Sequence, residues 1–206
     1  MKLFGVALPA LTPELTFALQ HWQELDPVWT EKQRYSRTLG NEVVELLDGI
    51  FTKAGNDAKK CLEEIVPAMS GSLQGLARVN WTVRNAANHW GAWGYIYKPR
   101  GPKKSLGWTG VYFDLHHKQP KLVLVIDPNG GFRRQLMEEC RSTWNGHLML
   151  TTDRRDPWPG WEDDPCLVYS VHDLGLNITL DQLKGQVCSV ARKFFRLAMS
   201  IVSQLH

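Results

Sequence analysis

Residues 84–89 combine two side chains that are able to act together on a phosphate group. Arg84 and His89 stand five positions apart, with Asn, Ala, Ala and Asn between them. A histidine can take up and return a proton near neutral pH, and an arginine can stabilise the negative charge that develops on a reacting phosphate. Arg84 and His89 are therefore the candidate catalytic residues of the chain.

The spacing of Arg84 and His89 resembles the Arg-x4-His motif of the helical ribonucleases known as the HEPN family, including the polar residue after the arginine. The resemblance covers six residues. It implies metal-free RNA cleavage in which Arg84 and His89 converge, often across a dimer. It also implies an all-α bundle, whereas strand-like sequence follows His89 within a few residues.

Asp114, His116, His117 and Asp127 come closest to a metal-site pattern. Asp114 could be the first acid of a metal-dependent nuclease, but the acid-x-Lys pattern expected on the next strand is missing around Asp127. Neighbouring histidines on a strand point to opposite faces, so they cannot easily share one ion. The Walker, Rossmann and G-x-S-x-G patterns are absent as well. We expect no metal and no cofactor, with a degenerate metal-dependent nuclease as an alternative.

Aromatic and basic residues are concentrated between residues 81 and 108. Four of the nine Trp residues fall within these 28 positions, and a Pro-, Gly- and Lys-rich loop follows Tyr97. Such a combination can stack and steer single-stranded nucleic acid, or anchor a protein partner; alternatively, the rings fill the core. The predicted binding residues are Trp90, Trp93, Lys98, Arg100, Lys103 and Lys104, joined by Arg133 and Arg134 and by Trp158 and Trp161 in an acidic loop at 153–165.

We therefore expect a non-catalytic binding protein of an accessory, inhibitor or regulatory type. Its partner is expected to be a protein first and a nucleic acid second, recognised through an aromatic and basic surface built from residues 84–104, with help from Arg133 and Arg134. A nuclease that uses Arg84 and His89, or a metal ion, is the alternative function. A structural homodimer is the second alternative.

The composition of the 206 residues sets the class of protein. With 43% hydrophobic and 22% charged residues, the chain is neither disordered nor, in the absence of a long apolar run, membrane-spanning. The net charge of +3 divides into −3 over residues 1–74 and +6 over residues 75–206, which is modest for nucleic-acid binding. Four scattered cysteines without metal-ligand spacing suit a reducing cytoplasm.

Helical patterns occupy the first 70 residues. Thr12 is a plausible N-cap with Pro13 at the first helical position, and Pro27 is expected to end this helix. A second helix is expected to turn Val43, Leu46, Leu47, Ile50 and Ala54 inward and to end at Gly55. A third is expected to be capped by Asn56 or Asp57 and to end near Pro67.

Strand patterns dominate residues 92–171. We expect strands at 93–97, 108–115, 121–126, 147–152 and 166–171, with a short helix at 132–141. Because residues 122–126 are apolar throughout, that strand is expected to be central and covered on both faces. The fold class is α+β: an N-terminal helical region at 1–74 and a mostly antiparallel sheet of about five strands at 75–206, packed together as one domain.

The last helix is predicted from the capping-box spacing of Thr179 and Gln182. Its apolar residues follow a 3-4-3-4 rhythm that could form a coiled-coil seam between two copies of the chain. A second apolar row lies beside the first, and so wide a stripe favours a helix packed within the core. A homodimer through this helix is the alternative.

Overall fold

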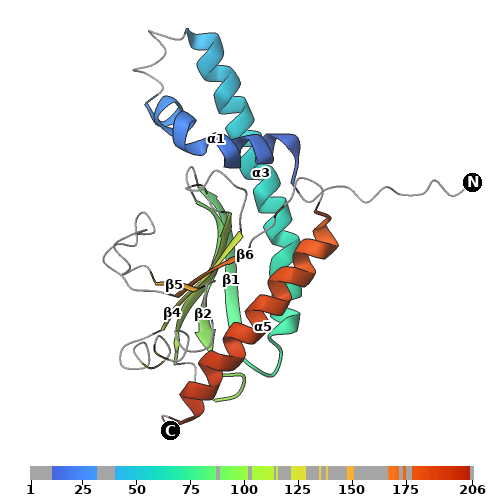
Figure 1. The fold of residues 1–206 in the computed structure, drawn as a ribbon, viewed down its shortest axis with the longest axis vertical. Helices are drawn as coiled ribbons and strands as arrows, with labels where there is room; N and C mark the ends of the chain where they lie inside the picture. Colours follow the sequence, from blue (N-terminus) through green and yellow to red (C-terminus); the bar gives the residue numbers. More distant parts are fainter. Residues whose placement is uncertain are drawn as a thin grey trace, which may run out of the picture.

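In the part of the chain that the computed structural model describes, three long helices accompany an antiparallel sheet (Figure 1). Along the chain, two helices precede the sheet and the third follows it. The predicted α+β class is thereby confirmed. The structure describes residues 11–31, 40–86, 89–101, 104–113, 115, 122–128, 135, 138, 148–150, 167–171, 174 and 178–204.

The first helix, α1 (Pro13–Thr30), begins as the sequence predicts. The Leu15 N–H donates to Thr12 Oγ1 at 3.2 Å, and Pro13 occupies the first turn. The expected end at Pro27 is wrong. Pro27 lies inside the last turn, where its carbonyl still accepts the Glu31 N–H at 2.9 Å. A proline removes one donor but not its own acceptor, so three more residues remain helical.

The second and third predicted helices are one continuous helix, α3 (Asn41–Ser72). Gly55 and Pro67 were expected to end helices, but both lie inside it. Pro67 is flanked by the buried Val66 and Met69, and burial of such side chains can outweigh the local cost of a proline. Asp57, expected as a cap, instead accepts a hydrogen bond from Thr12 Oγ1 at 2.9 Å and so joins α3 to the start of α1.

The sheet has the strand order β1-β2-β3-β4-β6-β5, with each pair antiparallel. The expected count of about five strands needs correction: four long strands are followed by two short ones. The first strand, at 78–86, was not expected from the sequence. The bounds are β1 (Arg78–Ala86), β2 (His89–Tyr97), β3 (Gly107–Phe113), β4 (Leu122–Pro128), β5 (Leu148–Leu150) and β6 (Leu167–Val171).

The central position of β4 is confirmed. It lies between β3 and β6, and Leu122 to Ile126 are all at most 2% exposed. Leu122, Leu124 and Ile126 belong to the core that the sheet shares with the helices. Val123 and Val125 alternate with them and are buried outside that core. Both faces of β4 are therefore covered, as its uninterrupted apolar sequence predicts.

The last helix, α5 (Leu180–Gln204), crosses α3 on the helical side of the sheet (Figure 1). Its capping box is confirmed: the Gln182 N–H donates to Thr179 Oγ1 at 3.3 Å, and the Thr179 N–H donates to Gln182 Oε1 at 2.9 Å. Leu183, Val187 and Phe194 of the heptad-like row are buried within the chain. This part of the row is therefore used for core packing.

One further prediction falls partly on the described residues, and another falls outside them. Gln135 and Glu138, within the short helix expected at 132–141, are both helical, and the rest of that segment lies outside the described residues. The loop expected at 153–165 lies wholly outside them. Among the helices that the structure describes, none combines the length and the apolar character needed to span a bilayer.

Candidate binding face on the sheet

Strand alternation sorts the aromatic residues of β2 and β3 onto two faces. Residues with even numbers on β2, such as Trp90, Ala92 and Ile96, are buried against the helices. Residues with odd numbers point the other way, because successive side chains of a strand alternate. The register pairs them with the even-numbered residues of β3, which therefore lie on the same face. We call this set the aromatic strip: Trp93, Tyr95, Tyr97, Trp108 and Tyr112.

Tyr95 is the most accessible ring of the aromatic strip. Its side chain is 48% exposed, whereas the other four residues are half-buried. The rings of Trp93 and Tyr95 meet edge-to-face with centroids 5.7 Å apart. This arrangement is favourable for aromatic pairs and holds Tyr95 by one edge. Part of the ring surface of Tyr95 is therefore left open beside a supporting neighbour.

Tyr112 forms the floor at one end of the strip. A Cβ atom on Gly91 would lie 2.0 Å from Tyr112 Cδ1, and one on Gly110 would lie 2.2 Å from Tyr112 Cε2. The phenol ring therefore lies across both glycines, Gly91 on the neighbouring strand β2 and Gly110 two residues earlier on β3 itself. Ring cover over strand glycines restores the packing that a missing side chain would otherwise lose.

Trp108 is fixed by a hydrogen bond. Its Nε1–H donates to Asp127 Oδ2 at 2.8 Å, across the β3–β4 pair. The charged end of Asp127 thus holds the indole in one orientation on this face. Asp127 was considered as a metal-ligand candidate. Within the described residues, no group of three or more His, Cys, Asp and Glu side chains could hold a metal ion.

Strand β1 gives the strip a polar border. Arg78, Asn80 and Thr82 are exposed and are paired with Tyr97, Tyr95 and Trp93, respectively. The guanidinium of Arg78 lies 5.4 Å from the centre of the Tyr97 ring, a cation–π contact. Among the described strands, β1 pairs only with β2, so it forms an edge of the sheet.

A basic end adjoins the strip where β2 leaves the sheet; we define it as Arg78, Lys98, Arg100 and Lys104. Arg100 and Lys104 are exposed and Lys98 is half-buried. The loop that carries them closes onto the sheet through the Leu106 N–H, which donates to the Ile96 carbonyl at 2.8 Å. Positive charge is thereby held beside Tyr97.

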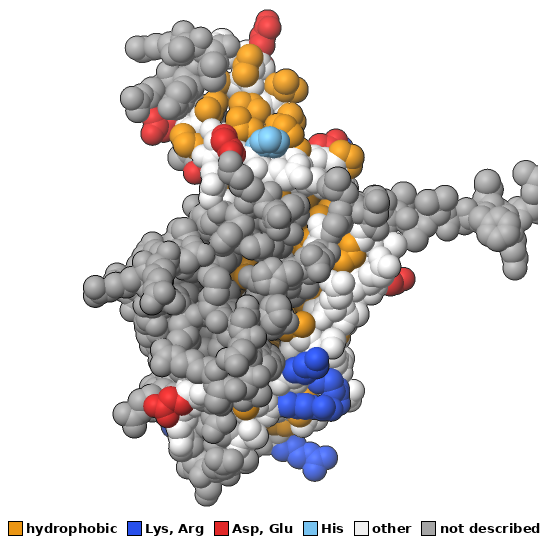
Figure 2. All heavy atoms as spheres, viewed as in Figure 1, with side chains coloured by type: hydrophobic (Ala, Val, Ile, Leu, Met, Phe, Trp, Pro, Cys, Tyr) orange, Lys and Arg blue, Asp and Glu red, His pale blue; other side chains and the backbone are white. Residues whose placement is uncertain are grey.

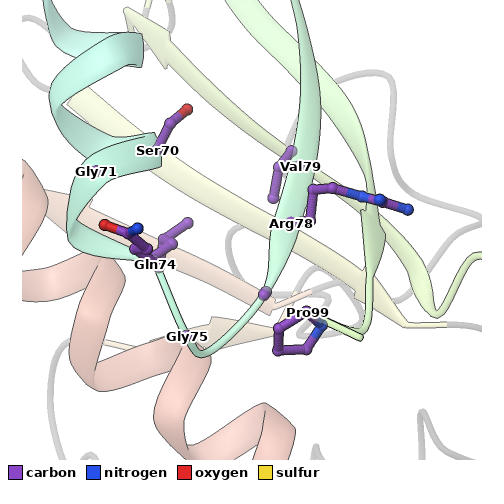
Figure 3. Close-up of a pocket in the computed structure, with 9 residues that line it drawn as sticks. Ser70, Gly71, Gln74, Gly75, Arg78, Val79 and Pro99 are labelled. Atoms are coloured by element: carbon purple, nitrogen blue, oxygen red, sulfur yellow. The ribbon is translucent and has the colours of Figure 1, made fainter. Parts of the chain in front are cut away.

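A depression of about 300 Å³ lies beside the basic end, between the end of α3 and the start of β1 (Figure 3). Ser70 and Gln74 line its helical side, Val79 its strand side and Pro99 its base. Figure 3 shows the guanidinium of Arg78 pointing away from α3, toward the sheet. The charge of Arg78 therefore serves the face of the sheet rather than this depression.

More positive charge lies on α5 nearby. Arg192 Nη1 donates to the Ser72 carbonyl at 2.5 Å, which ties α5 to the end of α3. Arg192, Lys193 and Arg196 are exposed. In the view of Figure 2, Lys and Arg side chains gather in the lower part of the molecule. This end of the molecule is thus positively charged over several elements.

The predicted binding residues have different outcomes. Trp90 is only 2% exposed and packs edge-to-face on Trp22, with centroids 5.4 Å apart. It belongs to the core, so we leave it out of the binding face. Trp93, Lys98, Arg100 and Lys104 lie on or beside one face. Lys103, Arg133, Arg134, Trp158 and Trp161 lie outside the described residues.

Arg84 and His89 lie on neighbouring strands. The register pairs Arg84 with Gly91, and His89 with Ala86. Both residues of the Arg-x4-His pattern therefore lie on paired antiparallel strands. The all-α bundle implied by the resemblance to the HEPN family is not the fold of this chain.

Arg78, Asn80, Thr82, Tyr95, Tyr97, Trp108 and Tyr112 were not among the predicted site residues. The signal that could have found the β1 members is the alternation of Val79, Trp81 and Val83 with polar residues, which is typical of a half-buried strand.

Comparisons with protein-family models, curated proteins and solved structures gave no match to this chain.

Proposed function

We propose that this protein is a binding protein whose aromatic strip and basic end recognise single-stranded nucleic acid. The observation that carries the proposal is the exposed ring of Tyr95, supported by Trp93 and followed on the same strand by Tyr97 and Lys98. Aromatic platforms bordered by positive charge bind single strands because any base can stack on a ring while cations neutralise the phosphates.

The spacing of the rings suits this role. Trp93, Tyr95 and Tyr97 are alternate residues of one strand, so their side chains emerge at intervals of about 7 Å. Successive unstacked bases could use successive rings. Asn80 and Thr82 are exposed on the neighbouring strand and can exchange hydrogen bonds with base edges.

The basic end would supply the phosphate contacts. Its four cations, Arg78, Lys98, Arg100 and Lys104, stand at the end of the strip where Tyr97 lies. Asp127 is the one acidic residue of β1 to β4 in the described part of this face, and Trp108 donates to its carboxylate. The charge of the described face thus favours a polyanion over a basic or neutral protein partner.

We propose that the protein binds its partner without catalysing a reaction. A ribonuclease using Arg84 and His89 is the alternative outcome, and substitution of either residue tests it. We also retain the proposal of a cytoplasmic location, which rests on the scattered cysteines.

The test is fluorescence anisotropy with labelled oligo(dT) and oligo(U), against the matched duplex. We expect single strands to bind more tightly than the duplex, and log Kd to change with log salt concentration with a slope of about 2–3 in magnitude, since four cations release about 0.7 counterions each. Replacement of Lys98, Arg100 and Lys104 by Ala should reduce that slope. The control is the double Ala variant of Lys59 and Lys60 on α3.

Three results would contradict the proposal. Absence of single-strand binding at low salt would remove it. Equal binding by the triple variant and the wild type would move the phosphate contacts away from the basic end. Degradation of the oligonucleotide, lost on Arg84→Ala or His89→Ala in a protein that still folds, would establish the ribonuclease instead.

A further inference from the structure

The first turns of α3 carry an apolar stripe that the fold leaves open. Val43 is 44% exposed and Leu46 is 64% exposed, while Leu47 and Ile50 are half-buried. These four residues have the i, i+3, i+4, i+7 spacing of a helix face that normally packs against another element. From its sequence pattern, this face was expected to lie in the core. In the structure, the neighbouring face with Val44 and Phe51 is buried instead.

The geometry of the crossing between α1 and α3 explains the exposure. Trp22 of α1 packs edge-to-face on Phe51 of α3, with centroids 5.4 Å apart. Contacts of Thr12 with Asp57 and of Glu14 with Lys53 also lie at or after this position of α3. The turns before Phe51 project beyond the crossing (Figure 1). The stripe therefore lies on the first turns of α3, residues 41–50, which we call the arm, on a face next to the buried Val44.

Hydrophobic side chains gather at this end of the molecule, over α1 and the beginning of α3, with acidic side chains among them (Figure 2). Phe17 of α1 is 37% exposed and adds to the apolar surface of this end. Single apolar residues scattered over a surface are normal, but these residues share one helix face. Contiguous exposed apolar patches of this kind mark interaction sites.

The negative charge beside the stripe indicates which kind of partner is favoured. Glu42 and Glu45 are exposed on the same turns of α3 as the stripe. Residues 11–52 contain seven Asp and Glu against three Lys and Arg, and the three basic residues lie between 32 and 39, outside the described residues. A partner that binds this arm therefore contacts an apolar stripe with exposed carboxylates beside it.

We propose that the stripe Val43, Leu46, Leu47 and Ile50 binds an amphipathic helix with a basic polar face, from another protein. Such a helix can lay its own apolar residues against the stripe while its Lys or Arg residues face Glu42 and Glu45. A second copy of the chain would bring two acidic arms together, which like-charge repulsion opposes. This inference does not depend on the proposed nucleic-acid binding, since the arm and the aromatic strip lie on different elements.

The experiment uses the whole protein and two synthetic 18-residue helical peptides. Both peptides have Leu at i, i+3, i+4 and i+7 positions; one has Lys at the remaining exposed positions and the other has Glu. We expect the Lys peptide to bind and the Glu peptide to bind at least about tenfold more weakly, as measured by calorimetry. The protein variant Leu46→Asp should weaken binding of the Lys peptide about tenfold, because one buried Leu contact is lost.

The direction of this effect separates stripe binding from attraction by net charge. Leu46→Asp adds a negative charge, so electrostatic attraction alone would strengthen binding of the Lys peptide. Gln186→Asp on α5 is the matched control, because it adds the same charge at an exposed position away from the arm. This control should leave the affinity within about twofold. Glu42→Lys with Glu45→Lys should reverse the preference between the two peptides.

Several outcomes would overturn the inference. They are failure of the Lys peptide to bind, equal affinity for both peptides, and unchanged affinity of Leu46→Asp in a protein that retains its circular dichroism spectrum. Sedimentation gives a further one: a dimer of the wild-type protein that Leu46→Asp dissociates would make a second copy the occupant of the stripe.

Discussion

Gly55 of α3 and Trp90 of β2 are in direct contact: a Cβ atom on residue 55 would stand 3.0 Å from Trp90 Nε1. The helix can approach the sheet this closely because residue 55 has no side chain. The indole then fills the space between the two layers and also meets Trp22 of α1. One glycine thus lets a single ring join α1, α3 and the sheet.

Gly55→Ala should destabilise the protein, although alanine is the better helix former. The gain in helix propensity is about 1 kcal/mol. The cost of moving a fully packed indole by a few tenths of an ångström is of the order of 1–3 kcal/mol, so we expect a net loss of about 1 kcal/mol. Urea unfolding measures the effect.

Gly49→Ala is the matched control for Gly55→Ala. Gly49 lies in the same helix, is exposed, and has no atom within 4 Å of the added Cβ. It should therefore stabilise the protein by about 0.5–1 kcal/mol. If both variants gained stability equally, Trp90 would not be limiting the approach of α3.

The cover of Tyr112 over two glycines gives a second test. Gly91→Ala should cost about 1–3 kcal/mol, because its Cβ atom would overlap the ring at Tyr112 Cδ1. In a Tyr112→Ala background the same substitution should cost much less. A double-mutant cycle measures this coupling, and additive effects of the two substitutions would show that the ring moves away freely.

Local signals predicted the starts of α1 and α5 correctly, and tertiary packing explains why the start expected at Asn56 or Asp57 and the ends expected at Gly55 and Pro67 were wrong. Thr12 and the pair Thr179 and Gln182 act on the N–H groups of their own turns, so spacing alone identifies them. Gly55 was interpreted as a helix end because sequence does not show an indole lying against it. At Pro67, too, burial of neighbouring residues outweighs the local preference.

The residue types of the proposed binding face were expected from the sequence, but several of the individual residues that form it were not. Trp90 and Trp93 are three positions apart, so on a strand they must point to opposite faces. Prediction placed the strand at 93–97, which left Trp90 outside it and free to join the surface. Because β2 begins at His89, Trp90 turns into the core, and register then brings Arg78 and Asn80 to the face.

The thiol of Cys61 should make stability depend on alkaline pH. Burial, helped by the charge of Glu64, raises the pKa of Cys61 to about 12 from an ordinary value near 9. Above pH 9 the unfolded chain loses this proton while the folded protein keeps it. The contribution of the thiol is therefore complete below pH 9 and declines as the pH rises toward 12.

Urea unfolding at pH 8 to 10.5 under reducing conditions measures this decline. The free energy of unfolding should fall by about 1–2 kcal/mol more in the wild type than in Cys61→Ala between pH 9 and 10.5. The variant corrects for the other groups that titrate in this range. Parallel curves for the two proteins would show that the folded protein exposes Cys61 to solvent.

Substitutions of Tyr95 and Trp90 should have different effects on single-strand binding and on stability. Trp90→Ala should cost about 3–5 kcal/mol of stability, because a buried ring leaves a cavity between α1, α3 and β2. Tyr95→Ala should change stability by less than about 1 kcal/mol but weaken single-strand binding by about 1–3 kcal/mol, the value of one stacked base. Phe17→Ala is the control, because it removes an exposed ring of α1. A Tyr95→Ala protein that bound oligo(dT) as tightly as the Phe17→Ala protein would show that the exposed ring of β2 carries none of the binding.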